Sequence, residues 1–296
     1  MTAETLISAL VSGVLLGGLY AVVAVGLSLI FGIIRVINFA HGSLLMIFLY
    51  AGFWLWSLFK LDPYVSILIV APLAFVSGYA VQHILIRPIF VREKAFVVEP
   101  LGVLLLMAGL DMVLTNGALL FFRSDSRAVL VSYGQATIPV GFLNLSVTRL
   151  ALLGIAVLIV VGLHWMLRRT EVGTIIRAVG QNREAAALCG VNIHRIYAFT
   201  FGLGVAVLGV GASAMLPFYF VEPSMGLPLG VKSFIIVVLG GLGSVPGALL
   251  GALIIGVVES VGAQFVPATA ASIFSLLLFL AILFLRPKGL LGVLEA

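Results

Sequence analysis

The chain has 296 residues, 62% of them apolar and only 9% charged, whereas soluble domains contain about 45–50% apolar and about 25% charged residues. This composition excludes an ordinary soluble domain and indicates an integral membrane protein. The net charge is +5, but no basic patch interleaved with aromatic residues is present, so nucleic acid is not an expected partner. The single cysteine, Cys189, excludes an internal disulfide.

Apolar stretches of roughly 20 residues recur along the chain, without the polar–apolar alternation of barrel strands. We therefore expect an all-α, polytopic bundle of membrane helices in one domain, residues 1–296, with about eight or nine spans. Two spans near Leu242 are short enough to be half-helices. The expected spans are Leu6–Ile34, Ser43–Phe59, Tyr64–Ile86, Val98–Phe122, Leu150–Leu167, Ile196–Val221, Leu229–Leu242, Gly247–Gly262 and Ile273–Leu285.

Basic residues predict the orientation, because lysine and arginine gather on the cytoplasmic side of membrane proteins. With residues 168–195 in the cytoplasm, that side receives Arg35, Arg87, Arg92, Lys94, Arg168, Arg169, Arg177, Arg183, Arg195, Arg286 and Lys288. The other side receives Lys60, Arg123, Arg127, Arg149 and Lys232. We therefore expect an outside N-terminus, an inside C-terminus and a long loop on the outer side at residues 123–148.

A polar cluster follows the first span. Asn38, His41 and Ser43 lie close together, with Phe39 among them, between two apolar helices. Buried polar groups at the level of the lipid are costly unless they are paired or face a polar cavity, so such clusters often mark a transport pathway. The alternative is a connecting turn in which Asn38 caps the next helix. The residue pattern supports both interpretations equally.

The most polar stretch, residues 168–195, carries five arginines and two glutamates between two apolar runs. Gly173 and Gly180 are expected to interrupt any long helix there. Asn182 is placed to cap a helix of about two turns over Arg183–Cys189.

The same helix has further terminal signals. Glu184 lies in its first turn, where a carboxylate interacts favourably with the helix dipole. Gly190 is the expected left-handed stop, and Asn192 can cap the following apolar helix. A short capped helix between two spans is an element that another protein can bind and displace.

A glycine-rich stretch runs from Val238 to Ala248 and continues to Gly251. Gly243, Gly247 and Gly251 are spaced by four residues, which lets another helix approach closely. Close packing explains Gly247 and Gly251. The cluster from Gly240 to Pro246, which includes Gly240, Gly241 and Gly243, instead favours a broken or re-entrant helix that gates transport.

Four ionisable residues fall inside expected spans: His83, Asp111, His164 and Glu259. Intramembrane carboxylates are candidates for function, but these residues form no pattern of the kind a proton relay needs. For Asp111 and Glu259 the alternatives are a functional role and a structural role, paired with polar backbone or with another subunit. No phosphate-binding loop, catalytic elbow, metal-binding pattern or cofactor motif is present, so neither an enzyme nor a metal site is expected.

Together these residues resemble the permease subunit of branched-chain amino acid ABC importers, the LivH type. The motifs are Ile37-Asn-Phe-Ala-His-Gly42, Arg177-Ala178, Ala186-x-Leu188-x-Gly190-Val191-Asn192, Val238-Leu-Gly-Gly-Leu-Gly-Ser-Val-Pro-Gly-Ala248 and Pro287-Lys-Gly-Leu-Leu-Gly292. Glu184, Ala185, Ala186 and Gly190 also match the front half of the EAA pattern through which importer permeases touch their ATPases. The later Ile-x-Leu-Pro of that pattern is absent.

The resemblance implies a five-part importer in the inner membrane of a bacterial cell. Its parts are this chain, a related LivM-like second permease, two cytoplasmic P-loop ATPases that bind ATP and Mg²⁺, and a periplasmic solute-binding protein. Residues 123–148 would then be a periplasmic loop. Solutes of relatives include branched-chain amino acids and, in divergent members, urea, amides or aromatic acids. Asn38, Phe39, His41 and Ser43 would border the path and Gly240–Gly243 would gate it, while Arg177, Arg183 and Glu184 would contact the ATPase. A stand-alone secondary transporter or channel, a scaffold and an intramembrane enzyme are the competing classes.

Overall fold

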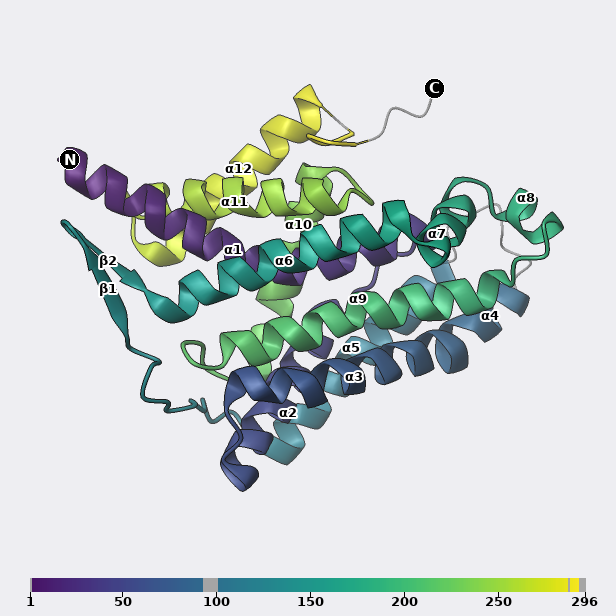
Figure 1. Ribbon diagram of the computed structural model, residues 1–296, viewed down its shortest axis with the longest axis horizontal. Coiled ribbons are helices and arrows are strands. Elements are labelled where there is room, and N and C mark those ends of the chain that lie inside the picture. The colour runs from purple at the N-terminus through teal and green to yellow at the C-terminus, as the bar shows by residue number, and fades with distance from the viewer. Residues whose placement is uncertain (1, 93–100, 287, 293–296) are drawn as a thin grey trace.

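The computed structural model describes residues 2–92, 101–286 and 288–292. Within these residues, eight helical segments are long and apolar enough to cross a membrane by length and composition. They form an elongated bundle (Figure 1). The segments are α1 (Ala3–Ile34), α2 (His41–Phe59), α3 (Pro63–Ala80) with its continuation, α5 (Leu101–Phe122), α6 (Val147–Arg169), α9 (Ile193–Met215), α10 (Gly226–Gly240) with the turn before it, and α11 (Val245–Gly262).

Shorter elements complete the described chain. The continuation of α3 is the π-helical η1 (Val81–Ile86), followed by α4 (Arg87–Arg92). The polar stretch forms α7 (Glu171–Gln181) and α8 (Arg183–Leu188). The turn η2 (Pro223–Met225) precedes α10, and the apolar α12 (Ala268–Leu285) ends the bundle. The predicted polytopic helical fold is therefore confirmed.

α1 lies at the centre of the bundle, with 78% of its most apolar window buried. It packs against α6, α9, α10 and α11, because its glycines let neighbouring backbones approach. A Cβ on Gly13 would lie 2.6 Å from Val257 Cα of α11, and a Cβ on Gly26 would lie 2.4 Å from Gly204 O of α9. These positions therefore require glycine.

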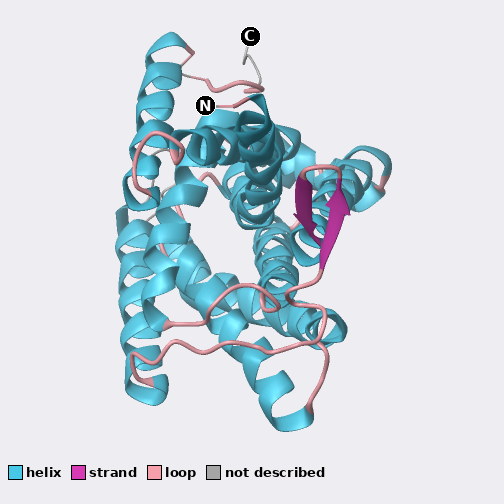
Figure 2. Cartoon of the chain, turned by 90° about the vertical axis from the view of Figure 1, so that its left-hand side faces the viewer, coloured by secondary structure: helices cyan, strands magenta, loops and turns pink. Residues whose placement is uncertain are grey.

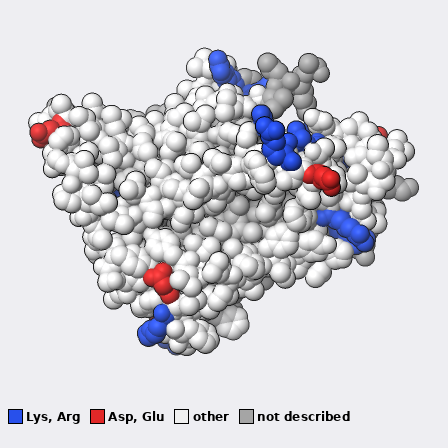
Figure 3. Space-filling view, viewed as in Figure 1, with Lys and Arg blue, Asp and Glu red and all other residues white. Residues whose placement is uncertain are grey.

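The outer helices α3, α5 and α6 are much less covered, with only 17–22% of their apolar windows buried. Their exposed side chains are mostly large and aliphatic, which suits lipid. On the face shown in Figure 3, the charged side chains lie in a few groups at the left end, at the lower and upper edges and towards the right, and a broad area between these groups is uncharged. This distribution is typical of a protein whose middle lies in the membrane.

The loop at residues 123–148 contains a β-hairpin that the sequence did not predict, formed by β1 (Thr137–Val140) and β2 (Leu143–Ser146). Figure 2 shows it beside the helical bundle. The turn needs a left-handed residue, which Gly141 supplies with φ +61°. The Tyr133 hydroxyl donates to Asp62 Oδ2 at 2.6 Å and so ties the loop to the start of α3.

Most predicted spans match a helix, with one boundary in error. The span predicted over Ile196–Val221 is too long, because α9 ends at Met215 and Val221 pairs through its backbone with Arg127. Val221 is apolar and buried beside the loop that carries Arg127. The sequence alone does not distinguish such a residue from the end of a span. The predicted start of another span at Val98, and the positions of Lys94 and Pro287, lie outside the described residues.

Candidate functional site

α2 begins inside the bundle. His41, its first residue, places Nε2 2.8 Å from the carbonyl oxygen of Val23 on α1. Val23 lies about 17 Å before the end of α1 at roughly 1.5 Å per residue. The chain therefore leaves α1 at Ile34, turns back towards the middle of the bundle through residues 35–40, and starts α2 at mid-depth. The sequence did not predict this re-entry.

The predicted polar cluster is buried at that point. Asn38 is 4% exposed and His41 1% exposed, and Ser43 is fully buried, with its hydroxyl donating to Ala40 O at 3.0 Å. Because the Val23 carbonyl accepts, Nε2 of His41 carries the proton. Neither polar atom of the Asn38 amide, nor Nδ1 of His41, has a hydrogen-bond partner in the described part of the chain. Buried polar groups are nearly always paired, so these groups call for a functional explanation.

The cap interpretation of Asn38 is wrong. The N-cap of α2 is Ala40, and no side chain accepts a hydrogen bond from this helix terminus. Phe39 differs from its buried neighbours, because its ring is 51% exposed. The cluster thus places unpaired polar atoms inside the bundle and one aromatic ring on its surface at the same point of the chain.

Glycines close the space beside this cluster. A Cβ on Gly42 would lie 1.9 Å from the carbonyl oxygen of Gly226, at the start of α10, and Gly230 also faces the Gly42 backbone. α2 and α10 therefore meet backbone to backbone at their first turns. Any path for a solute between these helices is shut in this conformation.

The predicted break near Gly240–Pro246 is present as a turn between two helices. α10 ends at Gly240 and α11 begins at Val245. Gly241 and Gly243 have φ of +105° and +83°, in the region that favours glycine. The predicted close approach is also confirmed, because Gly247 and Gly251 pack against the backbone of α10.

This turn is fixed on two sides. A Cβ on Gly243 would lie 2.7 Å from Gly32 Cα near the end of α1, and Leu290 and Leu291 donate backbone hydrogen bonds to Leu239 O and Gly240 O at 2.9 and 3.0 Å. The C-terminal segment therefore fastens the end of α10. A gating role for this turn stays a prediction.

The capping predictions in residues 168–195 are confirmed. The Asn182 side chain accepts from Ala185 N at 2.9 Å and starts α8, and the Asn192 side chain accepts from Arg195 N at 3.1 Å and starts α9. Gly190 has φ +82°. The sequence therefore predicted the start of α8, the left-handed residue after it and the start of α9.

Gly173 and Gly180 do not interrupt a helix, which corrects the prediction. Both lie inside the continuous α7, and the chain turns earlier, at Thr170, whose side chain accepts from Gly173 N at 3.0 Å. Close packing requires glycine at the first position, because a Cβ on Gly173 would lie 2.2 Å from Met166 O. A Cβ on Gly180 would lie 3.4 Å from Gly32 O of α1, an ordinary contact distance, so packing does not require glycine there.

α8 presents most of its surface outward. Ala186 is buried at 6% exposure, whereas Glu184, Ala185 and Cys189 are exposed and Leu188 is 90% exposed. Arg177 on α7 is also exposed, and its guanidinium donates to the Thr174 hydroxyl at 3.4 Å. An almost fully exposed leucine beside charged residues on a projecting helix is typical of a protein contact site.

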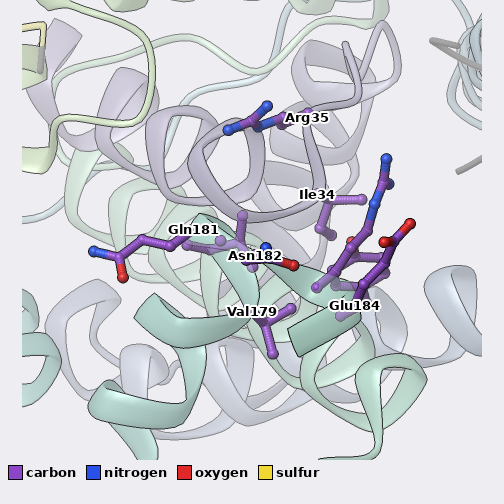
Figure 4. Close-up of a pocket in the computed structure, with 10 residues that line it drawn as sticks. Ile34, Arg35, Val179, Gln181, Asn182 and Glu184 are labelled. Carbon is purple, nitrogen blue, oxygen red and sulfur yellow. The ribbon is translucent and has the colours of Figure 1, made fainter. Parts of the chain in front are cut away.

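A cavity of about 200 Å³ lies behind α8. Figure 4 shows Ile34 and Arg35 on the α1 side and Gln181, Asn182 and Glu184 on the side of α7 and α8. Arg35 ends α1 in a left-handed conformation, with φ +55°. The cavity also reaches Tyr197 on α9. The residues around it belong to α1, α7, α8 and α9, so the cavity lies where α7 and α8 meet the two most buried spans.

Glu259 has partners within the chain. Its carboxylate forms an ion pair with Lys232 of α10, and it accepts hydrogen bonds from Tyr20 of α1 at 2.6 Å and Ser275 of α12 at 2.8 Å. These partners support the structural alternative for Glu259. They join four helices, and no local pattern in the sequence indicates this pairing, because Lys232 and Glu259 lie on separate spans.

The other predicted ionisable positions are not brought together. His83 lies on η1, exposed, with Nε2 3.4 Å from a guanidinium nitrogen of Arg87. His164 is half-buried near the end of α6. Asp111 is half-buried in the middle of α5. These placements support no proton relay.

Comparisons with known proteins cover nearly the whole chain. The family model described as "Branched-chain amino acid transport system / permease component" matches residues 9–284. The high-affinity branched-chain amino acid transport system permease protein BraD of Pseudomonas aeruginosa is 29% identical, across 96% of this chain and 94% of its own length. The LivH permease protein of Salmonella typhimurium is 30% identical, across 95% and 94%. No solved structure matches the chain.

A third relative matches over a similar extent. The probable branched-chain amino acid transport permease protein LivH of Methanocaldococcus jannaschii is 28% identical, across 95% of this chain and 90% of its own length. Permease relatives together with eight apolar spanning helices among the described residues make this a multi-pass protein of the inner membrane. The chain belongs to the family of permease components of branched-chain amino acid transport systems.

Proposed function

We propose that this chain is one of two permease subunits in an ATP-driven importer of branched-chain or related small amino acids. The names of the relatives support the solute class. The observation that carries the coupling is α8, a capped helix of six residues that projects from the bundle with Leu188 90% exposed. In this proposal α8 enters a groove on a cytoplasmic ATPase, where Glu184, Arg183 and Arg177 supply polar contacts.

The proposed orientation follows from charge. The end of the bundle that carries α7 and α8 also carries Arg35 at the end of α1, Arg168 and Arg169 at the end of α6, and Arg195 at the start of α9. Basic residues favour the cytoplasm. The opposite end, with the β-hairpin, is then periplasmic. Residues 123–148 are the proposed contact for the solute-binding protein, because they form the longest ordered loop at that end.

The mechanism is a two-state equilibrium biased from both sides of the membrane. Closure of the ATPases moves α8, and contacts around the cavity pass this displacement to α1 and α9. Nucleotide and loaded binding protein need only stabilise different states. Opening requires α2 and α10 to separate at Gly42 and Gly226, which would expose Asn38 and His41 to the solute.

The partners follow from the same proposal. The chain pairs with a second, LivM-like permease, with which it forms the path, and with two P-loop ATPases that hold ATP and Mg²⁺. No cofactor is proposed for this chain. A periplasmic binding protein delivers the solute and supplies most of the selectivity.

The coupling is tested by Glu184→Lys and Gly190→Val in the assembled transporter. The first reverses a charge on the exposed face of α8, and the second strains a backbone with φ +82° where a Cβ meets no atom within 4 Å. We expect both to lower binding-protein-stimulated ATP hydrolysis and uptake together, while the exposed control Cys189→Ser leaves both unchanged. Full activity in both variants would contradict the coupling role.

A further inference from the structure

α5 is an apolar span that its own chain leaves largely uncovered. Only 17% of its most apolar window is buried, against 78% for α1, and its packing partners are α2, η2 and η1. Met112 and Val113 are 65% and 68% exposed. Lipid suits these two side chains, but it does not suit the carboxylate of Asp111, which lies next to Met112 in the chain.

Asp111 lies in the middle of α5, about 15 Å from either end of the helix at roughly 1.5 Å per residue. It is half-buried, and among the described residues it takes part in no hydrogen bond or ion pair. Intramembrane carboxylates almost always face a protein interior or a water-filled cavity and have a partner. Glu259 in the same chain follows this rule, with an ion pair and two hydroxyl donors.

Aromatic stacking relates the depth of Asp111 to that of the buried polar cluster. Tyr50 of α2 stacks on Phe122 of α5 with ring centroids 4.1 Å apart, and both helices run towards the end with the β-hairpin (Figure 1). His41 lies about 14 Å before Tyr50 along α2, and Asp111 about 17 Å before Phe122 along α5, at roughly 1.5 Å per residue. Asp111 is therefore at about the depth of His41.

Asp111 belongs to a continuous stripe of α5. Helical spacings of four, three and four residues place Leu104, Ala108, Asp111 and Thr115 on one side, and all four are half-buried. The stripe is the margin between the face packed on α2 and the exposed face. Ala108 and Thr115, one turn before and after Asp111, are small residues that let another helix approach the carboxylate closely.

We propose that this stripe is the contact site for a membrane helix of the second permease, which presents a lysine, arginine, histidine or hydroxyl or amide donor to Asp111 at mid-membrane. This inference rests on the proposed two-permease importer. A second copy of this chain is disfavoured, because a symmetric contact between two α5 helices sets Asp111 against its own counterpart. Lipid tails offer no donor at this depth.

The contact is tested by photo-crosslinking in membranes that contain the complete transporter. Cys189→Ser removes the native thiol, and Met112→Cys or Val113→Cys carries a benzophenone maleimide. The two positions are almost equally exposed, but Met112 borders the stripe and Val113 lies about 100° further around the helix. We expect a product with the second permease from Met112→Cys and none from Val113→Cys.

Two crosslinking results would overturn the proposal. One is lipid adducts alone from Met112→Cys, and the other is a product between two copies of this chain. Co-purification of the P-loop ATPases is recorded in the same samples and reports on the proposed function separately. If the ATPases co-purify but the Met112→Cys product is absent, the result supports the proposed importer and contradicts the α5 contact.

Asp111→Leu gives a second readout. We expect recovery of the second permease with this chain to fall by about three- to thirty-fold, the range expected from losing one interhelical polar contact in a membrane. Melting of the isolated chain in detergent stays unchanged, because Asp111 has no partner there. Unchanged recovery of the second permease, with only an altered KM for the solute, would place Asp111 on the solute path and overturn the contact.

Discussion

α1 and α5 have similar hydropathy but very different surroundings. Their mean hydropathies are 2.4 and 1.9, yet 78% of the apolar window is buried in α1 and 17% in α5. α1 meets α9 and α11 through glycines that nothing larger could replace, whereas a Cβ on Gly109 or Gly117 of α5 meets no atom within 4 Å. Hydropathy therefore predicts that a helix crosses the membrane, and close backbone contacts at glycine decide which helix is central.

The two regions also differ in whether their carboxylate has a partner within the chain. Glu259 is held by partners from α1, α10 and α12, and it joins the centre of the bundle. Asp111 on α5 has none of these within the described residues. A buried charge that is paired inside the chain contributes to its fold, and one without an internal partner points to a contact outside the chain.

The largest expected effect comes from unpairing Glu259. Lys232→Met removes the cation and leaves a carboxylate that is 5% exposed, and breaking a buried pair on one side costs about 3–5 kcal/mol. We expect a clear drop in the free energy of unfolding, measured by titration with dodecyl sulfate in mixed micelles. Asp111→Asn is the matched control and should leave the curve in place. Equal stability of the two variants would contradict the statement that Glu259 stabilises the fold and Asp111 does not.

Adding a methyl group at the centre is the next largest change. Gly42→Ala places a Cβ 1.9 Å from Gly226 O, and overpacking of this kind costs about 1–3 kcal/mol. Gly109→Ala on α5 makes the same chemical change in open space and should cost nothing comparable. Thermal melting in detergent, followed by size exclusion, measures both. If Gly109→Ala destabilises the chain as much as Gly42→Ala, glycine packing does not distinguish the regions.

A smaller effect, of opposite sign for stability and uptake, is expected at Asn38. Its buried amide is unpaired, and such a group costs about 1–3 kcal/mol, so Asn38→Leu should unfold at the same or a higher temperature. Uptake by the assembled transporter should nevertheless fall, because the polar surface of the path is lost. Asn116→Leu on the exposed face of α5 is the control. Full uptake by Asn38→Leu would remove Asn38 from the path.

Local chemistry in the sequence was sufficient for some elements. Apolar length predicted the spans, and the side chains of Asn182 and Asn192 predicted the helix starts that they cap. The glycine-rich stretch predicted the turn between α10 and α11. These features depend on residues within a few positions of one another, so a linear reading finds them.

Other features depend on distant parts of the chain. The start of α2 at mid-depth is fixed by Val23 on α1, and Glu259 finds Lys232 on a separate helix. α7 stays helical across Gly173 and Gly180 despite the poor helix propensity of glycine, and Gly173 packs closely against the backbone of Met166 and Leu167 at the end of α6. The hairpin at Thr137–Ser146 is short and half-exposed, so it has no clear alternation.

We expect this chain to transport only when a partner that hydrolyses ATP drives it through α8. The most direct measurement is uptake of radiolabelled leucine into proteoliposomes with the binding protein outside and ATP inside, with and without the ATPase subunits beside both permeases. We expect uptake above the solute gradient only when the ATPases are present, and loss of that uptake with Glu184→Lys. Accumulation by the permeases alone would contradict the claim.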